Sequence, residues 1–327
     1  MRDVGLVGLP FSGKSTLFTA LTRAGAAGGR ANQAVVPVPD ERLDVLAEME
    51  SSAKIVPAQV RFVDVPGGTS AQAVAQLRET DALCIVLRGF GPDRDPAGDL
   101  ASVHADLLLA DLSNVETGLE RARRKAKGRD EEAVADVTRL ERAAALLEAE
   151  RPLREGGFDD ADLKALRGYG FLTLKPWIVV ANLEEGESLP DELPDGSVAV
   201  YASIEAEVAA MDPAEAAALL KEFGVAEPGL DTVISAAYRA LDLITFLTTG
   251  EDETRAWQVR RGALAPEAAG AIHSDLERGF IRAEVVSYDE LVAAGSWAAA
   301  KARGVLRVEG KSYEVREGDV LHVRFAV

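Results

Sequence analysis

The sequence contains few of the residues that build covalent or metal-based frameworks. Cys84 is the only cysteine among 327 residues, so no disulfide can form within the chain. The three histidines, His104, His273 and His322, are scattered, which argues against a structural zinc site. A single cysteine is typical of a reducing compartment, and we therefore expect a cytoplasmic protein.

Long apolar runs and positive charge are also scarce. No run approaches the roughly 20 apolar residues that a membrane helix needs. The chain has 36 Lys and Arg against 54 Asp and Glu, a formal net charge of -18. Such a surface repels nucleic acid unless positive charge is concentrated locally. The one dense positive cluster in the sequence, here called the basic tip, consists of Arg121, Arg123, Arg124, Lys125, Lys127 and Arg129.

The first hundred residues alternate between short apolar strands and helical segments. Residues 15–22 have apolar positions at helical spacing. Strands are expected at 4–7, 60–63 and 82–87, and again at 177–181 and 198–201. Short β-branched strands between helices predict an α/β fold with a parallel sheet covered on both faces. We assign residues 1–104 and 170–240 to this domain.

Two amphipathic helices interrupt the α/β pattern. Their apolar residues recur at spacings of three and four, which predicts two narrow seams that pack together. Gly128 provides a turn between them, so the sequence predicts a helical hairpin domain inserted at 105–169. The seam residues are Leu108, Leu112, Val115 and Leu119 in the first helix and Val137, Leu140, Ala144 and Leu147 in the second.

The pattern of apolar and polar residues changes once more after residue 240. Short strand-like segments surround one or two helices, which predicts a small α+β domain at 241–327. The expected strands are 243–248, 255–259, 280–286, 305–308, 312–315 and 321–325.

The strongest chemical motif is Gly8-Leu9-Pro10-Phe11-Ser12-Gly13-Lys14-Ser15, which fits G-x-x-x-x-G-K-[ST]. Glycines let backbone N–H groups approach phosphate oxygens, and the helix that begins near Lys14 contributes its positive end. Lys14 is predicted to reach the β- and γ-phosphates, and Ser15 to ligate Mg²⁺. Gly8 to Ser15 and Thr16 are therefore candidate nucleotide contacts. A strand before the motif and a helix after it support this reading over a plain glycine turn.

Asp64-Val65-Pro66-Gly67 ends the second strand of the α/β pattern. In phosphate-loop proteins an acid at this place holds Mg²⁺ through water, and the glycine N–H contacts the γ-phosphate. Asp64 is thus the second candidate metal residue and Gly67 a candidate nucleotide contact. The alternative is a turn that only terminates the strand.

Asn182-Leu183-Glu184-Glu185 follows the strand at 177–181, where nucleotide-switch proteins read the base. A guanine reader carries N-K-x-D there. Leu183 replaces the lysine and Glu185 the aspartate, and the longer carboxylate does not suit the guanine edge in the same geometry. Asn182, Leu183 and Glu185 are therefore predicted to face the base. Ser203 follows the next strand and is a further candidate, while an acidic surface loop is the alternative for 182–187.

The order of these motifs, with the runs at 36–40 and 78–82, resembles the YchF group of Obg-like ATPases. The C-terminal third is similar to that family's TGS-type β-grasp module at 255–257, 265–270 and 277–284. The resemblance implies a P-loop domain with an inserted helical domain and a TGS-like β-grasp domain. It also implies ATP preferred over GTP, slow Mg²⁺-dependent hydrolysis, and association with ribosomes or ribosomal RNA, for which the basic tip and the TGS-like domain are the candidate surfaces.

The chain departs from the family pattern where hydrolysis and switching are concerned. Phe11-Ser12 stands where the family has Asn-Val, and no threonine lies between Arg23 and Asp40 to serve as the Mg²⁺ ligand of a first switch. Only residues 68–73 separate Gly67 from the next helix, and the family histidine implicated in hydrolysis falls at Gln76. Lys14 and Gln76 are the candidate catalytic residues, and we expect impaired hydrolysis.

Three functions remain open from the sequence. The first is a slow ATPase that cycles between conformations. The second is a binding protein for which the nucleotide is a regulatory ligand and RNA is the target. The third is a guanine-specific switch, if Glu185 mimics aspartate. For the basic tip, the alternative to RNA binding is a solvated helix end with ion pairs to nearby glutamates.

Overall fold

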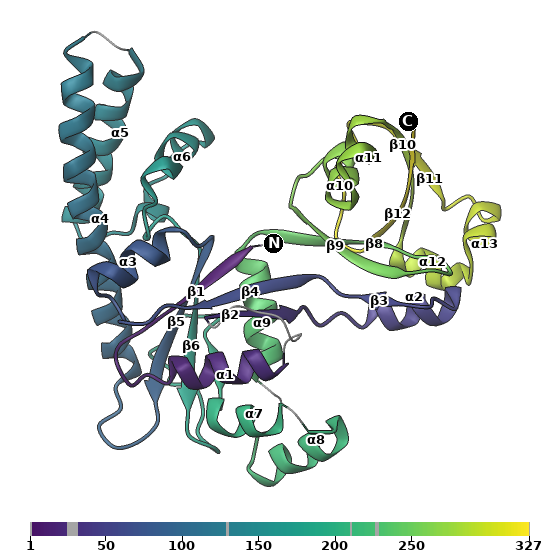
Figure 1. Ribbon diagram of the computed structural model, residues 1–327, viewed down its shortest axis with the longest axis horizontal. Coiled ribbons are helices and arrows are strands. Elements are labelled where there is room, and N and C mark those ends of the chain that lie inside the picture. The colour runs from purple at the N-terminus through teal and green to yellow at the C-terminus, as the bar shows by residue number, and fades with distance from the viewer. Residues whose placement is uncertain (1, 25–31, 129–130, 210, 226–228, 327) are drawn as a thin grey trace. The chain divides into compact units, whose positions relative to one another are not determined.

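The computed structural model describes residues 2–24, 32–128, 131–209, 211–225 and 229–326 (Figure 1). The chain divides into two compact units. The first comprises Met1–Val36 and Arg61–Val233, and the second Pro37–Val60 and Ile234–Val327. None of the helices within the described ranges is long and apolar enough to cross a membrane.

A six-stranded sheet organises the first unit, in the order β2-β4-β1-β5-β6-β7. Neighbouring strands from β4 through β1, β5 and β6 to β7 are parallel, as the alternating pattern predicts. The carboxyl ends of β1, β4, β5 and β6 therefore meet at one edge, where candidate nucleotide residues lie. The strands are β1 (Asp3–Val7), β2 (Gln33–Pro37), β4 (Gln59–Asp64), β5 (Ala82–Gly89), β6 (Trp177–Leu183) and β7 (Val198–Val200).

Helices cover both faces of this sheet. On one face, α3 (Ala71–Arg78) and the first turns of α4 (Pro96–Ala126) pack against alternate residues of β5, with Leu77 and Leu107 buried beside Ile85. The intervening strand residues Cys84 and Val86 point to the opposite face and are also fully buried. The other helices of this part are α1 (Lys14–Ala24), α7 (Ala202–Val208), α8 (Pro213–Glu222) and α9 (Gly229–Ala240).

The helical hairpin is formed by α4 and α5 (Glu131–Glu148), whose outer half projects away from the sheet in Figure 1. Asp95 caps the start of α4 by accepting a hydrogen bond from the Gly98 N–H at 2.9 Å. The eight predicted seam residues all lie in the hydrophobic cluster between the two helices, which confirms the predicted packing. Gly128 begins the turn, with its N–H donating to the Lys125 carbonyl at 2.9 Å. The hairpin is followed by η1 (Leu153–Glu155), α6 (Asp160–Leu166) and η2 (Arg167–Tyr169).

The second unit contains a mixed sheet in the order β11-β10-β12-β8-β9-β3. The hairpin β8–β9 is antiparallel, β12 runs parallel to β8, and α10 buries Ala265, Ala268 and Ala269 against the sheet. This is the β-grasp arrangement that the sequence predicts. Its elements are β8 (Leu243–Thr248), β9 (Thr254–Arg260), α10 (Ala265–Ile272), α11 (Ser274–Arg278), β10 (Phe280–Ser287), α12 (Tyr288–Ala294), α13 (Trp297–Ala302), β11 (Arg307–Glu309) and β12 (Asp319–Phe325).

Two details of this unit differ from the sequence prediction. Residues 312–315 form no strand and contribute only an isolated bridge between Glu314 and Leu264. The strand expected at 305–308 begins two residues later, at Arg307.

In addition, α2 (Arg42–Glu50) and β3 (Ile55–Val56) belong to this unit, because β3 pairs with β9 and Arg42 forms ion pairs with Asp40 and Glu317, both at 2.7 Å.

Candidate nucleotide-binding site

The loop between β1 and α1 is built so that only glycine fits at its two key positions. A Cβ on Gly8 would lie 2.2 Å from the Val86 carbonyl oxygen of β5. Gly13 has a φ of +86°, and a Cβ there would lie 2.0 Å from Nδ2 of Asn182. The first glycine lets β5 approach closely, and the second lets the loop turn into α1.

Lys14 points its ammonium group back into this loop. Its Nζ donates to the carbonyl oxygens of Gly8 at 2.7 Å and Leu9 at 2.9 Å. Burial lowers the pKa of Lys14, and the nearby Asp64 carboxylate partly offsets this. A half-buried ammonium at the start of a helix, with flexible carbonyl partners, is placed to exchange these bonds for phosphate oxygens.

Asp64 and Ser15 are the two candidate metal residues of this site. Burial raises the pKa of Asp64, while Lys14 opposes the shift. Ser15 is exposed in the first turn of α1, and Thr16 beside it is half-buried. A hydroxyl and a carboxylate are hard ligands that suit Mg²⁺ when substrate phosphates and waters complete the shell. In the described part of the chain no group of three or more His, Cys, Asp or Glu is placed to hold a metal ion.

The remaining loop residues have distinct environments. Leu9 is half-buried and Pro10 exposed, whereas Phe11 is 86% exposed with a φ of +65°, an uncommon left-handed conformation for a non-glycine residue. Ser12 is 1% exposed, and its Oγ has no hydrogen-bond partner within the described ranges. The side chains that the tip of this loop presents to solvent are therefore those of Pro10 and Phe11.

Gly67 and Gly68 follow Asp64 in a tight turn, with φ values of +95° and +61°. A Cβ on Gly68 would lie 3.3 Å from the Gly8 carbonyl oxygen, so this turn lies directly against the phosphate loop. Gly67 itself is exposed. Its position beside the loop is consistent with the predicted γ-phosphate contact.

Asn182 is buried and joins two loops of the site. Its Nδ2 donates to the Ser12 carbonyl at 3.4 Å, and its Oδ1 accepts from the Ala202 N–H at 3.1 Å. The amide therefore braces the phosphate loop. Leu183, also predicted to face the base, is 5% exposed and packs in the sheet core beside Gly89. A nucleotide contact from Leu183 is therefore confined to its backbone.

Glu185 and Ser203 are accessible from solvent on neighbouring loops. Glu185 is half-buried and forms no hydrogen bond or ion pair with any residue that the structure describes, and Ser203 is exposed in the first turn of α7. Phe90, which the sequence analysis missed, lies beside the phosphate loop, since a Cβ on Gly13 would be 3.5 Å from its ring. An apolar residue directly after β5, at the edge where the base is expected, was the available signal.

Two predicted features are less well defined by the structure. Gln76 is half-buried in α3, and its side chain makes no hydrogen bond within the described ranges. The segment 25–31, where a first-switch threonine was sought, lies outside the described residues, as does Arg129 of the basic tip.

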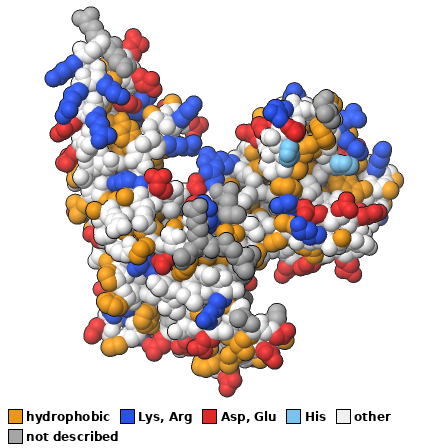
Figure 2. All heavy atoms as spheres, in the orientation of Figure 1, with side chains coloured by type: hydrophobic (Ala, Val, Ile, Leu, Met, Phe, Trp, Pro, Cys, Tyr) orange, Lys and Arg blue, Asp and Glu red, His pale blue; other side chains and the backbone are white. Residues whose placement is uncertain are grey.

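The rest of the basic tip is exposed at the end of α4. Arg123 pairs with Glu141 at 2.8 Å and Arg124 with Glu120 at 3.4 Å, whereas Arg121, Lys125 and Lys127 form no ion pair in the described structure. Figure 2 shows Lys and Arg side chains gathered along the long helical pair. Both interpretations of the cluster thus retain support, since two of its members are paired and three present their charge to solvent.

The glycine-bounded loop between β1 and α1, its inward lysine and the acid at the end of β4 define the nucleotide-binding domain of a P-loop NTPase. The comparisons narrow this class. The model for 50S ribosome-binding GTPases matches residues 3–121, and the model for the C-terminal domain of YchF GTPases, described as a protein of unknown function, matches 243–326.

Full-length relatives identify the family. The chain is 40% identical to the ribosome-binding ATPase YchF of Haemophilus ducreyi and 38% identical to that of Bacillus subtilis, each comparison covering 99% of both chains. The solved structure of the Schizosaccharomyces pombe YchF GTPase matches with a TM-score of 0.88 and 29% identity, over 99% of this chain and 97% of that one. This chain belongs to the YchF family.

The alignment with the Haemophilus ducreyi protein spans 358 positions, more than the 327 residues of this chain. That relative therefore carries residues with no counterpart here.

Proposed function

We propose that this protein binds ATP with Mg²⁺ in the loop Gly8–Ser15 and hydrolyses it slowly. The observation that carries the proposal is the Lys14 ammonium, held by two carbonyl groups of its own loop at 2.7 and 2.9 Å. These weak backbone acceptors are replaced by phosphate oxygens at little cost, because the charge-assisted bonds to phosphate are stronger. Ser15 and Asp64 would hold the metal, which neutralises phosphate charge during transfer.

Adenine is the proposed base. Asn182 uses both ends of its amide to brace the protein, so it positions the loops. The carboxylate of Glu185 and the ring of Phe90 remain to contact a base, by accepting a hydrogen bond and by stacking respectively. Two relatives that are 40% and 41% identical to this chain are named as ATPases, which supports adenine over guanine as the base.

Ribosomal RNA is the proposed partner, in a cytoplasmic setting. The relatives are named as ribosome-binding, and this acidic chain concentrates positive charge at the end of α4. Phosphate groups attract such a cluster through release of counterions, which makes the association sensitive to salt. The TGS-like β-grasp domain is the second proposed surface.

The test is a calorimetric titration of the whole chain with ATP and with GTP in the presence of Mg²⁺. We expect ATP to bind at least tenfold more tightly. Glu185→Asp introduces the guanine-type carboxylate without disturbing the buried Leu183. This change should reduce the ratio of ATP affinity to GTP affinity. GTP binding more tightly than ATP to the unmodified chain would instead favour the guanine-specific switch.

A further inference from the structure

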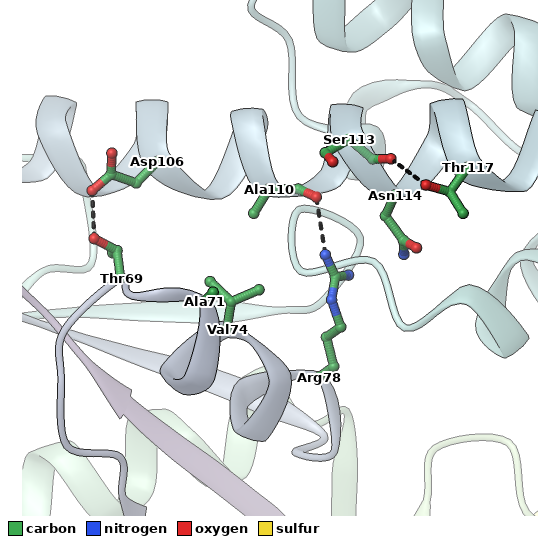
Figure 3. A pocket seen from close by; sticks show the side chains of 9 residues that line it. All are labelled: Thr69, Ala71, Val74, Arg78, Asp106, Ala110, Ser113, Asn114 and Thr117. Carbon is green, nitrogen blue, oxygen red and sulfur yellow. Dashed lines mark hydrogen bonds between the residues drawn. The ribbon is translucent and has the colours of Figure 1, made fainter.

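A groove of about 450 Å³ separates α3 from α4, and Figure 3 shows the side chains that line it. Helix α3 follows the Gly67–Gly68 turn of the nucleotide site, and α4 is the first helix of the hairpin. The groove is polar at its two ends, near Thr69 and Asp106 and near Arg78 and Asn114, with Val74 between them. The two ends hold α3 to α4 in very different ways.

The Arg78 end is a fixed anchor. Arg78 donates to Asp111 at 3.1 Å, to the Gly170 carbonyl at 2.8 Å and to the Ala110 carbonyl at 3.0 Å. Asp111 is fully buried and also accepts from the backbone N–H groups of Leu172 and Thr173, at 3.0 and 2.7 Å. Such a buried, saturated network is costly to break.

Lys175 strengthens the same anchor. Its Nζ donates to the carbonyl oxygens of Leu77 at 2.9 Å and Arg78 at 2.7 Å, and also to that of Thr80. These are carbonyl groups at the C-terminal end of α3, where a positive charge is favourable. The C-terminal end of α3 is therefore tied both to α4 and to the segment 170–175 that precedes β6.

At the Thr69 end, a single hydrogen bond joins the two elements. Thr69 Oγ1 donates to Asp106 Oδ2 at 2.5 Å, a short charge-assisted hydrogen bond (Figure 3). Among the described residues, no other hydrogen bond or ion pair joins residues 66–73 to α4. Apart from apolar packing of Val65 and Ala73 in the cluster that contains Val103 and Leu107, one hydroxyl thus makes the polar link between the segment that follows Asp64 and the hairpin.

Thr69 also lies next to the part of that loop that meets the phosphate site. Gly68 lies against the Gly8 carbonyl, where a Cβ would be 3.3 Å away, and Gly67 N–H is the proposed γ-phosphate donor. A contiguous series of contacts therefore runs from Gly8 through Gly68 and Thr69 to Asp106. Because α3 is anchored at its other end, a shift of Gly67 towards a γ-phosphate must be accommodated at Thr69.

We propose that Thr69 and Asp106 are positioning residues for the γ-phosphate loop, and that their hydrogen bond transmits the presence of the γ-phosphate to α4. The proposal rests on the nucleotide-binding function proposed above. Thr69 acts through Gly67, so its loss should weaken binding of a triphosphate but not of a diphosphate. A merely structural role would weaken both or neither.

The experiment compares the affinities of ADP and of the hydrolysis-resistant analogue AMP-PNP, both with Mg²⁺, by calorimetry. Thr69→Val, which keeps the shape but removes the hydroxyl, should lower AMP-PNP affinity about tenfold, equivalent to ~1.4 kcal/mol, and leave ADP affinity within twofold. Thr69→Ser should restore the unmodified values. Thr117→Val is the matched control, because Thr117 lines the same groove but donates only to its own helix, to the Ser113 carbonyl at 3.1 Å.

Amide hydrogen exchange supplies the second readout. AMP-PNP should slow exchange in the Asp106 turn of α4 in the unmodified chain, and this response should disappear in Thr69→Val and in Asp106→Ala. Asp106→Ala also serves if Thr69→Val does not fold. Equal losses for ADP and AMP-PNP, no loss for either, or an α4 response that persists would each overturn the proposal. Absence of any nucleotide binding to the unmodified chain would instead refute the proposed function itself.

Discussion

The side-chain amide of Asn182 occupies the space where a side chain on Gly13 would begin, with Nδ2 only 2.0 Å from the position of such a Cβ. The same amide donates to the Ser12 carbonyl at 3.4 Å and accepts from Ala202. The phosphate loop, the end of β6 and the start of α7 are therefore joined through one asparagine. The shape of the phosphate site depends on this contact as much as on the loop's own sequence.

Gly13→Ala should abolish nucleotide binding, because the added methyl group displaces Asn182 and is also strained at a φ of +86°. The matched control is Gly91→Ala, which has a similar φ of +74° but no neighbouring atom within 4 Å of the new Cβ. The control should lose only about 1 kcal/mol of stability from backbone strain and retain its ATP affinity. Calorimetry and thermal unfolding of both variants measure the difference. Equal ATP affinities would show that the clash is unimportant.

Asp111→Ala should lower the free energy of unfolding by about 3–5 kcal/mol, since it leaves Arg78 and two backbone N–H groups without their buried acceptor. Asp136→Ala is the control, because that carboxylate pairs with Arg139 in a partly exposed position at 3.0 Å. Its loss should cost less than about 1 kcal/mol. Urea unfolding provides both values, and similar costs would contradict the anchor assigned to Asp111.

The basic tip should account for association with ribosomes. The residues to change are Arg121, Lys125 and Lys127, because they form no ion pair in the described part of the structure. Arg123 and Arg124, in contrast, are each paired with a glutamate. Changing these three residues to glutamate should largely abolish cosedimentation with ribosomes. Any residual cosedimentation should depend less steeply on salt concentration. The control reverses Lys54, Lys164 and Lys221, which are exposed and dispersed, and changes the net charge equally. Loss of ribosome binding in both variants would indicate an effect of net charge. Loss in neither variant would favour the alternative that the basic tip is a solvated helix end.

Hydrolysis should be slow, with single-turnover rates near background. Phosphoryl transfer requires a positioned water and stabilised charge. No threonine lies between Arg23 and Asp40, and the turn after Gly67 is short. Loss of one transition-state contact typically costs on the order of 10²–10³ in rate. Phosphate release measured with the enzyme in excess over ATP checks this, and Gln76→Ala tests the candidate catalytic glutamine of α3. Turnover that rises only with ribosomes would mean that missing groups arrive from the partner, whereas fast turnover by the chain alone would contradict the prediction.

The sequence predicted those features that follow from local pattern. The spacing of Leu108, Val115, Leu140 and their neighbours determines the hairpin, because a helix brings residues three and four apart onto one face. The phosphate loop was equally predictable, since the spacing of Gly8, Gly13, Lys14 and Ser15 fits a known motif. These are properties of short segments, and no knowledge of the rest of the chain was needed.

Contacts between distant segments were not predictable in this way. The pairing of β3 with β9 joins residues nearly 200 positions apart, and β3 is too short to show a pattern. Leu183 was predicted to contact the base because it occupies a recognition motif, but its place in β6 directs it into the core. The hydrogen bond from Thr69 to Asp106 likewise follows from the way α4 crosses the sheet, which neither residue's neighbours indicate.

The most direct test of the account is the affinity for Mg²⁺-ATP of the unmodified chain and of Lys14→Ala, measured by calorimetry beside Lys54→Ala, an exposed lysine in the other unit. Lys14 donates within the phosphate loop, and loss of charge-assisted contacts to phosphate should lower affinity about a hundredfold. Omission of Mg²⁺ should weaken binding to the unmodified chain as well. The account predicts that Lys54→Ala binds as the unmodified chain does. Equal affinities of Lys14→Ala and the unmodified chain would contradict the assignment of Gly8–Ser15 as the phosphate site.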